Sequence, residues 1–258
     1  SSVQINQPAP YSTSFKDHPH MVQDPAGNLH AVWMDGRDCD ESRVKTGIFY
    51  SRSTDGGVTW SPDAKVSGPR NAECVTGGAH ASDPFIQALS DKEVWVVYLS
   101  HVDASLPQNR VMLVRSLDGG TTWSAPVTPT PTADGERASP KLVVLSSASS
   151  RRATVFWFQD LTDDVDATNM YYGIYAATTT NGVDFTNNGR IKGNVGTSTP
   201  QYPTAFKSSD LGVAEWRTWT SSLLWWESHN TVDATNYANL YFMEYTGTPA
   251  YDYICHTE

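Results

Sequence analysis

The chain has 258 residues, of which 39% are hydrophobic, 18% charged and 11% aromatic, and its formal net charge is −10. This length suits one large core, whereas the negative charge, without any run of Lys or Arg, argues against nucleic acid and anionic membranes as partners. No apolar stretch approaches the ~18 residues that a membrane-spanning helix needs, so the sequence predicts no membrane span.

The chain begins at Ser1 and is poor in Lys but rich in Thr, Ser and Asn. That composition predicts a secreted, extracellular protein whose signal peptide has been removed, although a trimmed chain would have the same start. Of the three cysteines, Cys39 and Cys74 fall in loops on one predicted face, which is compatible with a disulfide, and Cys255 is left over.

An eight-residue motif recurs along the chain. Residues 53–60 read STDGGVTW and residues 116–123 read SLDGGTTW, with six identical positions, and a degenerate third copy starts at Thr179, at the same interval. An internal repeat of this kind indicates a repeated structural unit. We interpret it as a hairpin turn, in which the Asp accepts backbone N–H groups, the glycines adopt positive φ and the Trp covers the apolar layer below. We therefore expect Asp55 and Asp118 to be structural.

Short runs of β-branched and aromatic residues, bounded by Gly, Pro, Asn or Asp, surround each turn. Such runs are typical of β-strands, and helical periodicity is absent. The runs fall into four groups, at 28–33, 47–52 and 64–67; at 93–98, 110–115 and 125–128; at 153–157, 170–175 and 189–192; and at 211–216 and 240–245.

A proline followed by an apolar run introduces each group, at Pro19, Pro84, Pro140 and Pro203. Four strands in each of four units are the pattern of a β-propeller. The sequence thus predicts one all-β domain, a propeller with four blades of four antiparallel strands, at about residues 16–68, 80–130, 137–193 and 200–258. We expect the N-terminal strand, residues 2–8, to complete the last blade and close the ring. A fifth blade would have to lie in the 217–239 loop and is disfavoured.

The loops that follow strand two and those that lead into strand one lie on the face opposite the repeated turns. In propellers a ligand usually binds on that face, at the mouth of the channel. Carboxylates, imidazoles, guanidiniums and aromatic rings are concentrated in these loops, at Lys16, His18, His20, Asp35, Arg37, Asp40, Asp83, Arg137, Tyr202, Arg217, Trp219 and Trp225.

The large aromatic residues divide into two groups. Trp219 and Trp225 lie outside the repeat, where they either stack on sugar rings or form a buried lid. The others align at the end of strand two and are expected in the core between blades: Trp33, Tyr98, Trp157 and Trp216.

The tripeptide Val-Asp-Ala occurs at 102–104, 165–167 and 232–234, in equivalent loops, where we expect each Asp to tie down its own loop. A calcium ion is compatible with such oxygen-rich loops, but the twelve-residue calcium loop with its glycine and terminal Glu is absent. We therefore expect no required cofactor, and the sequence leaves the metal content undefined.

The repeated turn resembles the Asp-box of the sialidase-like (BNR-repeat) propellers, Ser/Thr-x-Asp-x-Gly-x-Thr-Trp. The first unit is also similar to the opening blade of exo-sialidases, through FKDHP at 15–19, WMDGR at 33–37 and SRSTDGG at 51–57. This resemblance implies a substrate-facing arginine at Arg37 and an acid/base near Asp40.

The chain also departs from that family. Lys16 stands where an arginine that clamps the sialic acid carboxylate is expected, and the sequence has four units where sialidases have six. No motif supplies the family's Tyr/Glu nucleophile pair, so true exo-sialidase activity is a minority interpretation. Arg137 and Arg217 are candidates for rebuilding a cationic clamp.

The candidate residues support two functions. A glycosidase needs a proton donor and a second carboxylate, which Asp35, Asp40 and Asp83 can supply, while His20 or His18 can act as the base for elimination on a uronic acid. The mouth loops differ from unit to unit, which favours one composite site and hence a carbohydrate-active enzyme acting on an anionic glycan. The alternative is a non-catalytic glycan-binding propeller, a lectin. A protein-docking face fits the charge but has no motif of its own.

In the enzyme interpretation, Arg37 holds the anionic sugar. We accordingly expect Arg37→Ala to abolish ligand binding or turnover with little loss of stability. The sequence does not define the sugar, its linkage or the oligomeric state.

Overall fold

The computed structural model describes residues 2–7, 16–37, 46–67, 80–101, 109–129, 137–146, 151–160, 172–192, 212–217, 220–230 and 236–245. These residues form strands, turns and extended segments with no helix among them, so this part of the chain is all-β, as predicted. Accordingly, it contains no helix suited to crossing a membrane. The chain divides into two compact units, residues 1–133 and 134–258.

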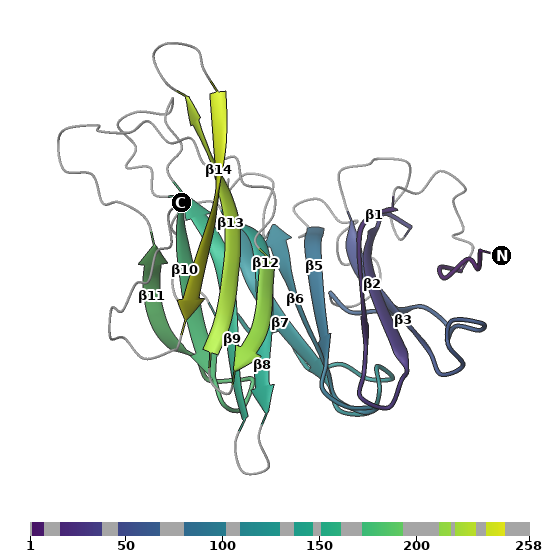
Figure 1. The fold of residues 1–258 in the computed structure, drawn as a ribbon. Helices are drawn as coiled ribbons and strands as arrows, with labels where there is room; N and C mark the ends of the chain where they lie inside the picture. The colour runs from purple at the N-terminus through teal and green to yellow at the C-terminus, as the bar shows by residue number, and fades with distance from the viewer. Residues whose placement is uncertain are drawn as a thin grey trace. The chain divides into compact units, whose positions relative to one another are not determined.

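The first unit contains two antiparallel sheets (Figure 1). The first sheet has the order β1 (Lys16–Gln23), β2 (Leu29–Asp35), β3 (Gly47–Ser53) and β4 (Ala64–Lys65). The second sheet contains β5 (His80–Ala88), β6 (Val94–His101) and β7 (Asn109–Ser116). The outer strand expected at 125–128 is reduced to a single bridge between Val127 and Leu113.

The second unit also contains two antiparallel sheets, and each of them falls within one of the predicted blade ranges. One sheet has the order β11 (Thr186–Lys192), β10 (Tyr172–Thr179), β9 (Arg151–Asp160) and β8 (Arg137–Ser146). The other has the order β12 (Gly212–Arg217), β13 (Thr220–Asn230) and β14 (Asn236–Tyr245).

The central strand β13 corrects the prediction of a long loop at 217–239. Trp225 pairs with Tyr241 in a ladder that runs from Ser221 to Asn230, and β12 pairs with the other edge of β13. A central strand satisfies its backbone N–H and C=O groups on both sides, which a loop of this length would not do. Trp225 therefore belongs to a strand.

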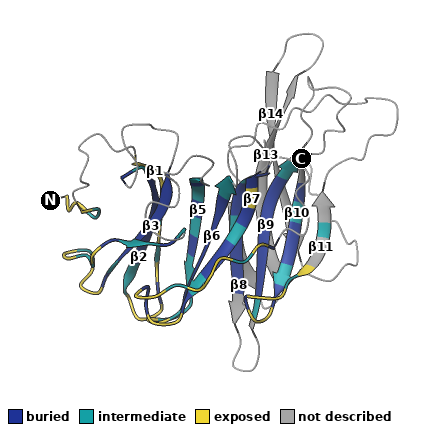
Figure 2. Ribbon diagram, turned by 180° about the vertical axis from the view of Figure 1, so that it is seen from behind, coloured by how far each residue is buried: buried dark blue, intermediate teal, exposed yellow. Residues whose placement is uncertain are grey.

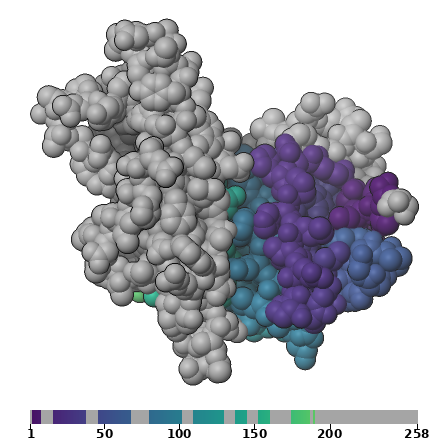
Figure 3. All heavy atoms as spheres, viewed as in Figure 1, coloured from purple at the N-terminus to yellow at the C-terminus, as the bar shows by residue number. Residues whose placement is uncertain are grey.

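The N-terminal segment also differs from expectation. Residues 2–7 form no strand, and Ile5 packs against Ala31, Trp33 and Phe49 of the first sheet. The backbone N–H of Gln7 donates to Asp63 Oδ2 at 2.8 Å. Figure 3 shows this segment beside the first sheet. Among the described residues the segment completes no blade and no closed ring is found; Ile5 instead packs, partly buried, against the first sheet.

The core of the first unit lies between its two sheets. Val32 and Ile48 of the first sheet meet Ile86 and Val96 of the second, and none of the four has exposed surface. In Figure 2 the buried residues run along β2, β3, β6 and β7, whereas exposed residues are found in the hairpin turns and along β1. Because β2 and β6 are buried on both faces, their sequences are continuous apolar runs.

The predicted core aromatics are buried where they can be described. Trp33, Tyr98 and Trp157 have at most 6% of their surface exposed, which confirms that these three are buried. Trp216 lies on β12, and its side chain is outside the described residues.

The repeated motif forms the predicted hairpin turn. Asp55 Oδ1 accepts backbone N–H groups from Val58 and Thr59 at 3.0 and 2.9 Å, and Asp118 has the same role in the second sheet. Hydrogen bonds with Thr59 lower the pKa of Asp55 to about 2. Each carboxylate is thus fully occupied in holding its own turn, as expected of a structural residue.

The second turn also locks the two sheets of the first unit together. The Trp123 ring meets the Tyr50 ring edge-on, with 5.1 Å between centroids, and the Tyr50 hydroxyl donates to the Gly119 carbonyl at 3.0 Å. Gly120 has a φ of 91°, and a Cβ there would lie 2.0 Å from the Tyr50 ring. Glycine is therefore required at 120 by both backbone conformation and close approach.

Behind Tyr50 lies a buried polar network. His30 Nδ1 is 2.7 Å from the Tyr50 hydroxyl, and His30 Nε2 is 3.1 Å from Asp24 Oδ2. Burial lowers the pKa of His30, although Asp24 opposes the shift. Burial alone would raise the pKa of Asp24, but hydrogen bonds from Asn28 and His30 outweigh it and lower the pKa to about 2.

We predict that Trp123→Ala lowers the free energy of unfolding by about 3 kcal/mol, because it removes a half-buried indole that joins the two sheets. Denaturant unfolding measures the loss. Val58→Ala is the control, because Val58 lies in the equivalent turn with 67% of its surface exposed and should change stability by less than about 0.5 kcal/mol. Equal effects of the two substitutions would contradict the locking role.

We also predict that the protein loses stability on mild acidification. The unfolded chain protonates His30 near its ordinary pKa of 6.5, whereas the folded chain protonates it only at lower pH. Unfolding therefore takes up protons, and the free energy of unfolding falls as the pH drops below 6.5. Asp24 adds a second loss as the pH falls from 3.8 towards 2.

The measurement is thermal unfolding between pH 5 and 8. In His30→Gln the unfolding temperature should fall less steeply as the pH drops below 6.5. Some pH dependence should remain, because burial also lowers the pKa of His101. A slope that is unchanged in His30→Gln would exclude His30 as its source.

Candidate functional site

In each sheet of the first unit, the polar residues predicted at the channel mouth lie at one end of the strands. Lys16 at the start of β1 pairs with Asp35 at the end of β2, and the repeated turn follows β3 at the opposite edge. The second sheet has the same arrangement, with His80 opposite His101. Within each sheet of the first unit, the candidate site residues therefore lie at the end away from the structural turns.

Three strands each contain one residue with a strained backbone near their first residues. His18, Asp83 and Ser139 have φ values of 49°, 49° and 48°, and each lies at a register shift in β1, β5 or β8. Each also precedes a proline. The left-handed region is costly for residues other than glycine, and a following proline favours extended backbone. A strained backbone in three sheets indicates a position where side-chain direction matters.

The first two of these residues meet. His18 Nε2 lies 3.1 Å from Asp83 Oδ1, with 51% and 32% of the two side chains exposed. On the other side of the ring, Asp17 Oδ1 accepts the His18 backbone N–H at 2.8 Å, and Asp17 Oδ2 lies 3.6 Å from Nδ1. A solvent-accessible imidazole from the first sheet thus lies between two carboxylates, one of them from the second sheet.

Two residues that the sequence did not single out lie behind Asp83. The Ser82 hydroxyl donates to Asp83 Oδ2 at 3.1 Å, and His101 Nε2 lies 3.2 Å from Ser82 Oγ. His101 stacks on His80 at 4.0 Å, with 14° between the ring planes. Burial lowers the pKa of His101, although Asp83 opposes the shift. The only sequence signal for these residues is their position at the ends of β5 and β6.

Arg37 does not have the geometry of a substrate-facing arginine. Its guanidinium donates to Asp35 Oδ2 from Nε at 2.9 Å and from Nη2 at 2.6 Å, and Nη1 pairs with Asp63. It lies over the Phe49 ring at 4.5 Å, and Arg37 is 4% exposed. Burial would lower the pKa of Arg37, but the two carboxylates outweigh it and raise the pKa. With its charge already paired, Arg37 holds the end of β2 to the segment before β4.

Two of the predicted catalytic residues also have structural partners. The Asp35 side chain has no exposed surface and accepts hydrogen bonds from Arg37 and from the Trp33 indole, at 3.1 Å for the latter. His20 stacks on Phe85 with 4.1 Å between centroids, and its Nδ1 accepts a 3.4 Å hydrogen bond from a backbone N–H of β5. The structure therefore brings His18 and Asp83 together at the site, and gives Asp35 and His20 packing roles.

The remaining candidates are only partly defined. Arg137 begins β8 opposite Gln159 and is 1% exposed. Arg217 ends β12 and Trp225 lies within β13, but their side chains are outside the described residues. Asp40, Tyr202, Trp219, Cys39 and Cys74 also fall outside the described residues.

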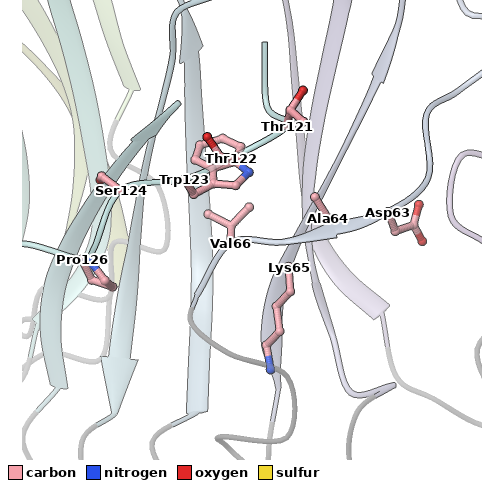
Figure 4. Close-up of a pocket in the computed structure, with 9 residues that line it drawn as sticks. All are labelled: Asp63, Ala64, Lys65, Val66, Thr121, Thr122, Trp123, Ser124 and Pro126. Carbon is pink, nitrogen blue, oxygen red and sulfur yellow. The ribbon is translucent and has the colours of Figure 1, made fainter. Parts of the chain in front are cut away.

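Metal-binding groups and grooves are the other features by which the described residues could hold a ligand. In the described ranges, no group of three or more His, Cys, Asp or Glu could hold a metal ion. A groove of about 460 Å³ lies elsewhere, between the β4 region and the turn after β7 (Figure 4). Its lining includes Lys65, Trp123 and Asp63, but Asp63 is paired with Arg37. The groove lacks a free pair of titratable groups, so we assign the candidate site to the His18 cluster.

No protein-family model and no curated protein sequence matches the chain. Its fold is similar to that of a Penicillium chrysogenum α-L-arabinanase complexed with arabinobiose, with a TM-score of 0.61 and 17% identity over 93% of this chain and 66% of that chain. The fold is also similar to that of an ulvan lyase bound to -[GlcA(1-4)Rha3S]-, with a TM-score of 0.60 and 11% identity over 94% of this chain and 55% of that chain. For a Streptococcus pneumoniae sialidase the TM-score is 0.58, with 9% identity over 97% of this chain and 52% of that chain.

All three neighbours are glycan-active propellers, so the likeness supports a propeller-type fold for this chain. The chain spans about two thirds of the arabinanase and about half of the other two enzymes. At these identities the likeness concerns the fold alone.

The environment of Arg37 reverses the expected effect of Arg37→Ala. We now predict a loss of about 3–5 kcal/mol in the free energy of unfolding, because the substitution leaves Asp63 buried without its cation and Asp35 with only Lys16, 3.9 Å away. Denaturant unfolding of Arg37→Ala and of Arg110→Ala tests this, since Arg110 lies exposed on β7 and its loss should be near neutral. Wild-type stability in Arg37→Ala would restore Arg37 to the list of substrate-binding candidates.

Proposed function

We propose that this protein is a glycosidase-like, carbohydrate-active enzyme that acts on an anionic glycan at the edge where β1 and β5 begin. The observation that carries the proposal is the 3.1 Å contact between His18 and Asp83, which joins two sheets through accessible titratable groups. The similarity in fold to an arabinanase, a lyase and a sialidase supports a carbohydrate as the substrate, and the anionic charge of that carbohydrate is part of the proposal.

The arrangement offers the groups that glycosidic cleavage needs. Hydrolysis requires a proton for the departing oxygen and a group that removes a proton from water. We propose His18, in contact with Asp83, as the group that removes a proton from water, and Asp40 as the proton donor from the sialidase-like resemblance. Lys16 is 31% exposed at the same end of the sheet and lies 3.9 Å from Asp35 Oδ2; we propose that its outer surface attracts an anionic sugar.

The other substrate contacts remain proposals. We retain Arg137, Arg217, Tyr202, Trp219 and Trp225 as candidates for holding the glycan. We place Arg37, Asp35 and His20 in the structure that supports the site, because their polar groups already have partners within the protein.

The finer family assignment is part of the proposal. We place the chain among the Asp-box propellers on the strength of two turns that share both sequence and hydrogen bonds. Four blades in a closed ring are proposed from the four groups of strand-like runs in the sequence. We also propose that the protein is secreted and that catalysis needs no cofactor, with calcium as a compatible structural ion.

The decisive experiment measures turnover of the full chain on sialosides, uronic-acid glycans and neutral arabinans. New reducing ends alone indicate hydrolysis, whereas ultraviolet absorbance from an unsaturated uronate indicates elimination. We predict that Asp83→Asn lowers kcat at least about 100-fold with little change in Tm. Asp91→Asn, in an exposed turn, should retain full activity.

Two outcomes would overturn the proposal. Full activity in Asp83→Asn would remove this edge from the reaction. Glycan binding without turnover of any substrate would favour the lectin alternative.

A further inference from the structure

We infer that Ser82 and His101 are positioning residues that hold Asp83 so that His18 keeps its proton on Nε2 and presents Nδ1 as its proton-accepting atom. This inference rests on the proposed function, in which His18 and Asp83 form the reactive pair. It assigns roles to two residues that lie behind that pair and that a substrate need not touch.

The backbone conformation at His18 and Asp83 sets the direction of both side chains. His18 and Asp83 occupy equivalent places in β1 and β5, each with a φ of 49° and each before a proline. An extended residue at either position would direct its side chain elsewhere, because the side-chain direction follows the backbone conformation. The strained conformation is retained at the two residues that meet at 3.1 Å, which is typical of strain at a functional site.

The direction of the hydrogen bonds supplies the second step. An ionised Asp83 only accepts, so the proton in its contact with His18 lies on Nε2. Ser82 has a single hydroxyl proton and donates it to Asp83 Oδ2. Ser82 Oγ therefore accepts from His101, whose Nε2 is 3.2 Å away. The hydrogen bonds therefore run in one direction, from His101 through Ser82 to Asp83.

The state of His101 supports this direction. Its ring lies 4.0 Å from the ring of His80, and two charged imidazoles would repel each other at this distance. Burial also lowers the pKa of His101, which keeps its ring neutral. A neutral ring with its proton on Nε2 can donate to Ser82 without bringing a second charge to Asp83.

These hydrogen bonds leave His18 Nδ1 as the nitrogen that can accept a proton. With Nε2 protonated against Asp83, the neutral ring carries its lone pair on Nδ1. Asp17 Oδ2 lies 3.6 Å from this atom, where it stabilises the imidazolium formed when Nδ1 takes a proton. Among the described residues, the charged groups in contact with His18 are Asp17 on β1 and Asp83 on β5; Lys16 on β1 is paired with Asp35 on β2. Asp83 thus orients the base as the carboxylate does in a catalytic triad.

The test reads the tautomer of His18 directly. In the full chain labelled with ¹⁵N-histidine, at a pH where the His18 ring is neutral, we expect the nitrogen shifts of the tautomer protonated on Nε2. Ser82→Ala and His101→Phe should move both shifts towards a mixture of the two tautomers. His101→Phe keeps a ring to stack on His80, whereas His101→Gln keeps an N–H donor and should retain the wild-type shifts.

Kinetics on an active substrate provides a second readout. Ser82→Ala and His101→Phe should lower kcat roughly tenfold with little change in KM, because the base is misoriented while substrate contacts remain. His101→Gln should recover most of kcat. Wild-type His18 shifts in both Ser82→Ala and His101→Phe would overturn the inference.

A glycine substitution tests the strain itself. Glycine adopts the left-handed conformation without penalty, so Asp83→Gly should have a Tm equal to or above that of the wild type while losing the Nε2 tautomer of His18. A clear fall in Tm would mean that Asp83 serves stability, and the inference would fail. The tautomer measurement needs no turnover, so a protein without activity would refute the proposed function and leave this test intact.

Discussion

The approach of Gly120 to the ring of Tyr50 governs how the two sheets of the first unit stack. Only glycine fits there, because a Cβ would lie 2.0 Å from the ring. Trp123 and the hydrogen bond from Tyr50 to Gly119 hold the turn in place from either side. With the sheets unable to slide past each other, the starts of β1 and β5 have a defined spacing, and His18 meets Asp83.

The two ends of these sheets differ in how their polar groups are satisfied. At the turn end, Asp24, Asp55 and Asp118 are each occupied by local hydrogen bonds, and Asp24 belongs to a network sealed from water. At the other end, His18 and Asp83 keep accessible surface and a strained backbone. The second end also contains the buried ion pairs of Arg37, and beside them His18 and Asp83 remain accessible for binding or chemistry.

Arg37 shows why a family-like motif does not define a site. Its sequence context resembles that of a substrate-binding arginine, but its charge is balanced by Asp35 and Asp63. The second partner lies before β4, in a different part of the same sheet. The fold is similar to glycan-active propellers, but a shared fold supports many chemistries. Function therefore has to be argued from the groups that remain accessible.

Local patterns in the sequence determined the strands, the repeated turns, the burial of Trp33, Tyr98 and Trp157, and the edge at which polar residues gather. Each of these depends on neighbours within a strand or a hairpin, where period and turn chemistry act directly. The tertiary structure alone decided that β13 is a central strand, that Ile5 covers the first sheet, that Asp63 neutralises Arg37 and that His18 meets Asp83. These contacts join residues far apart in the chain, or depend on a strained backbone that residue type does not reveal, so they exist only once the sheets have paired and stacked.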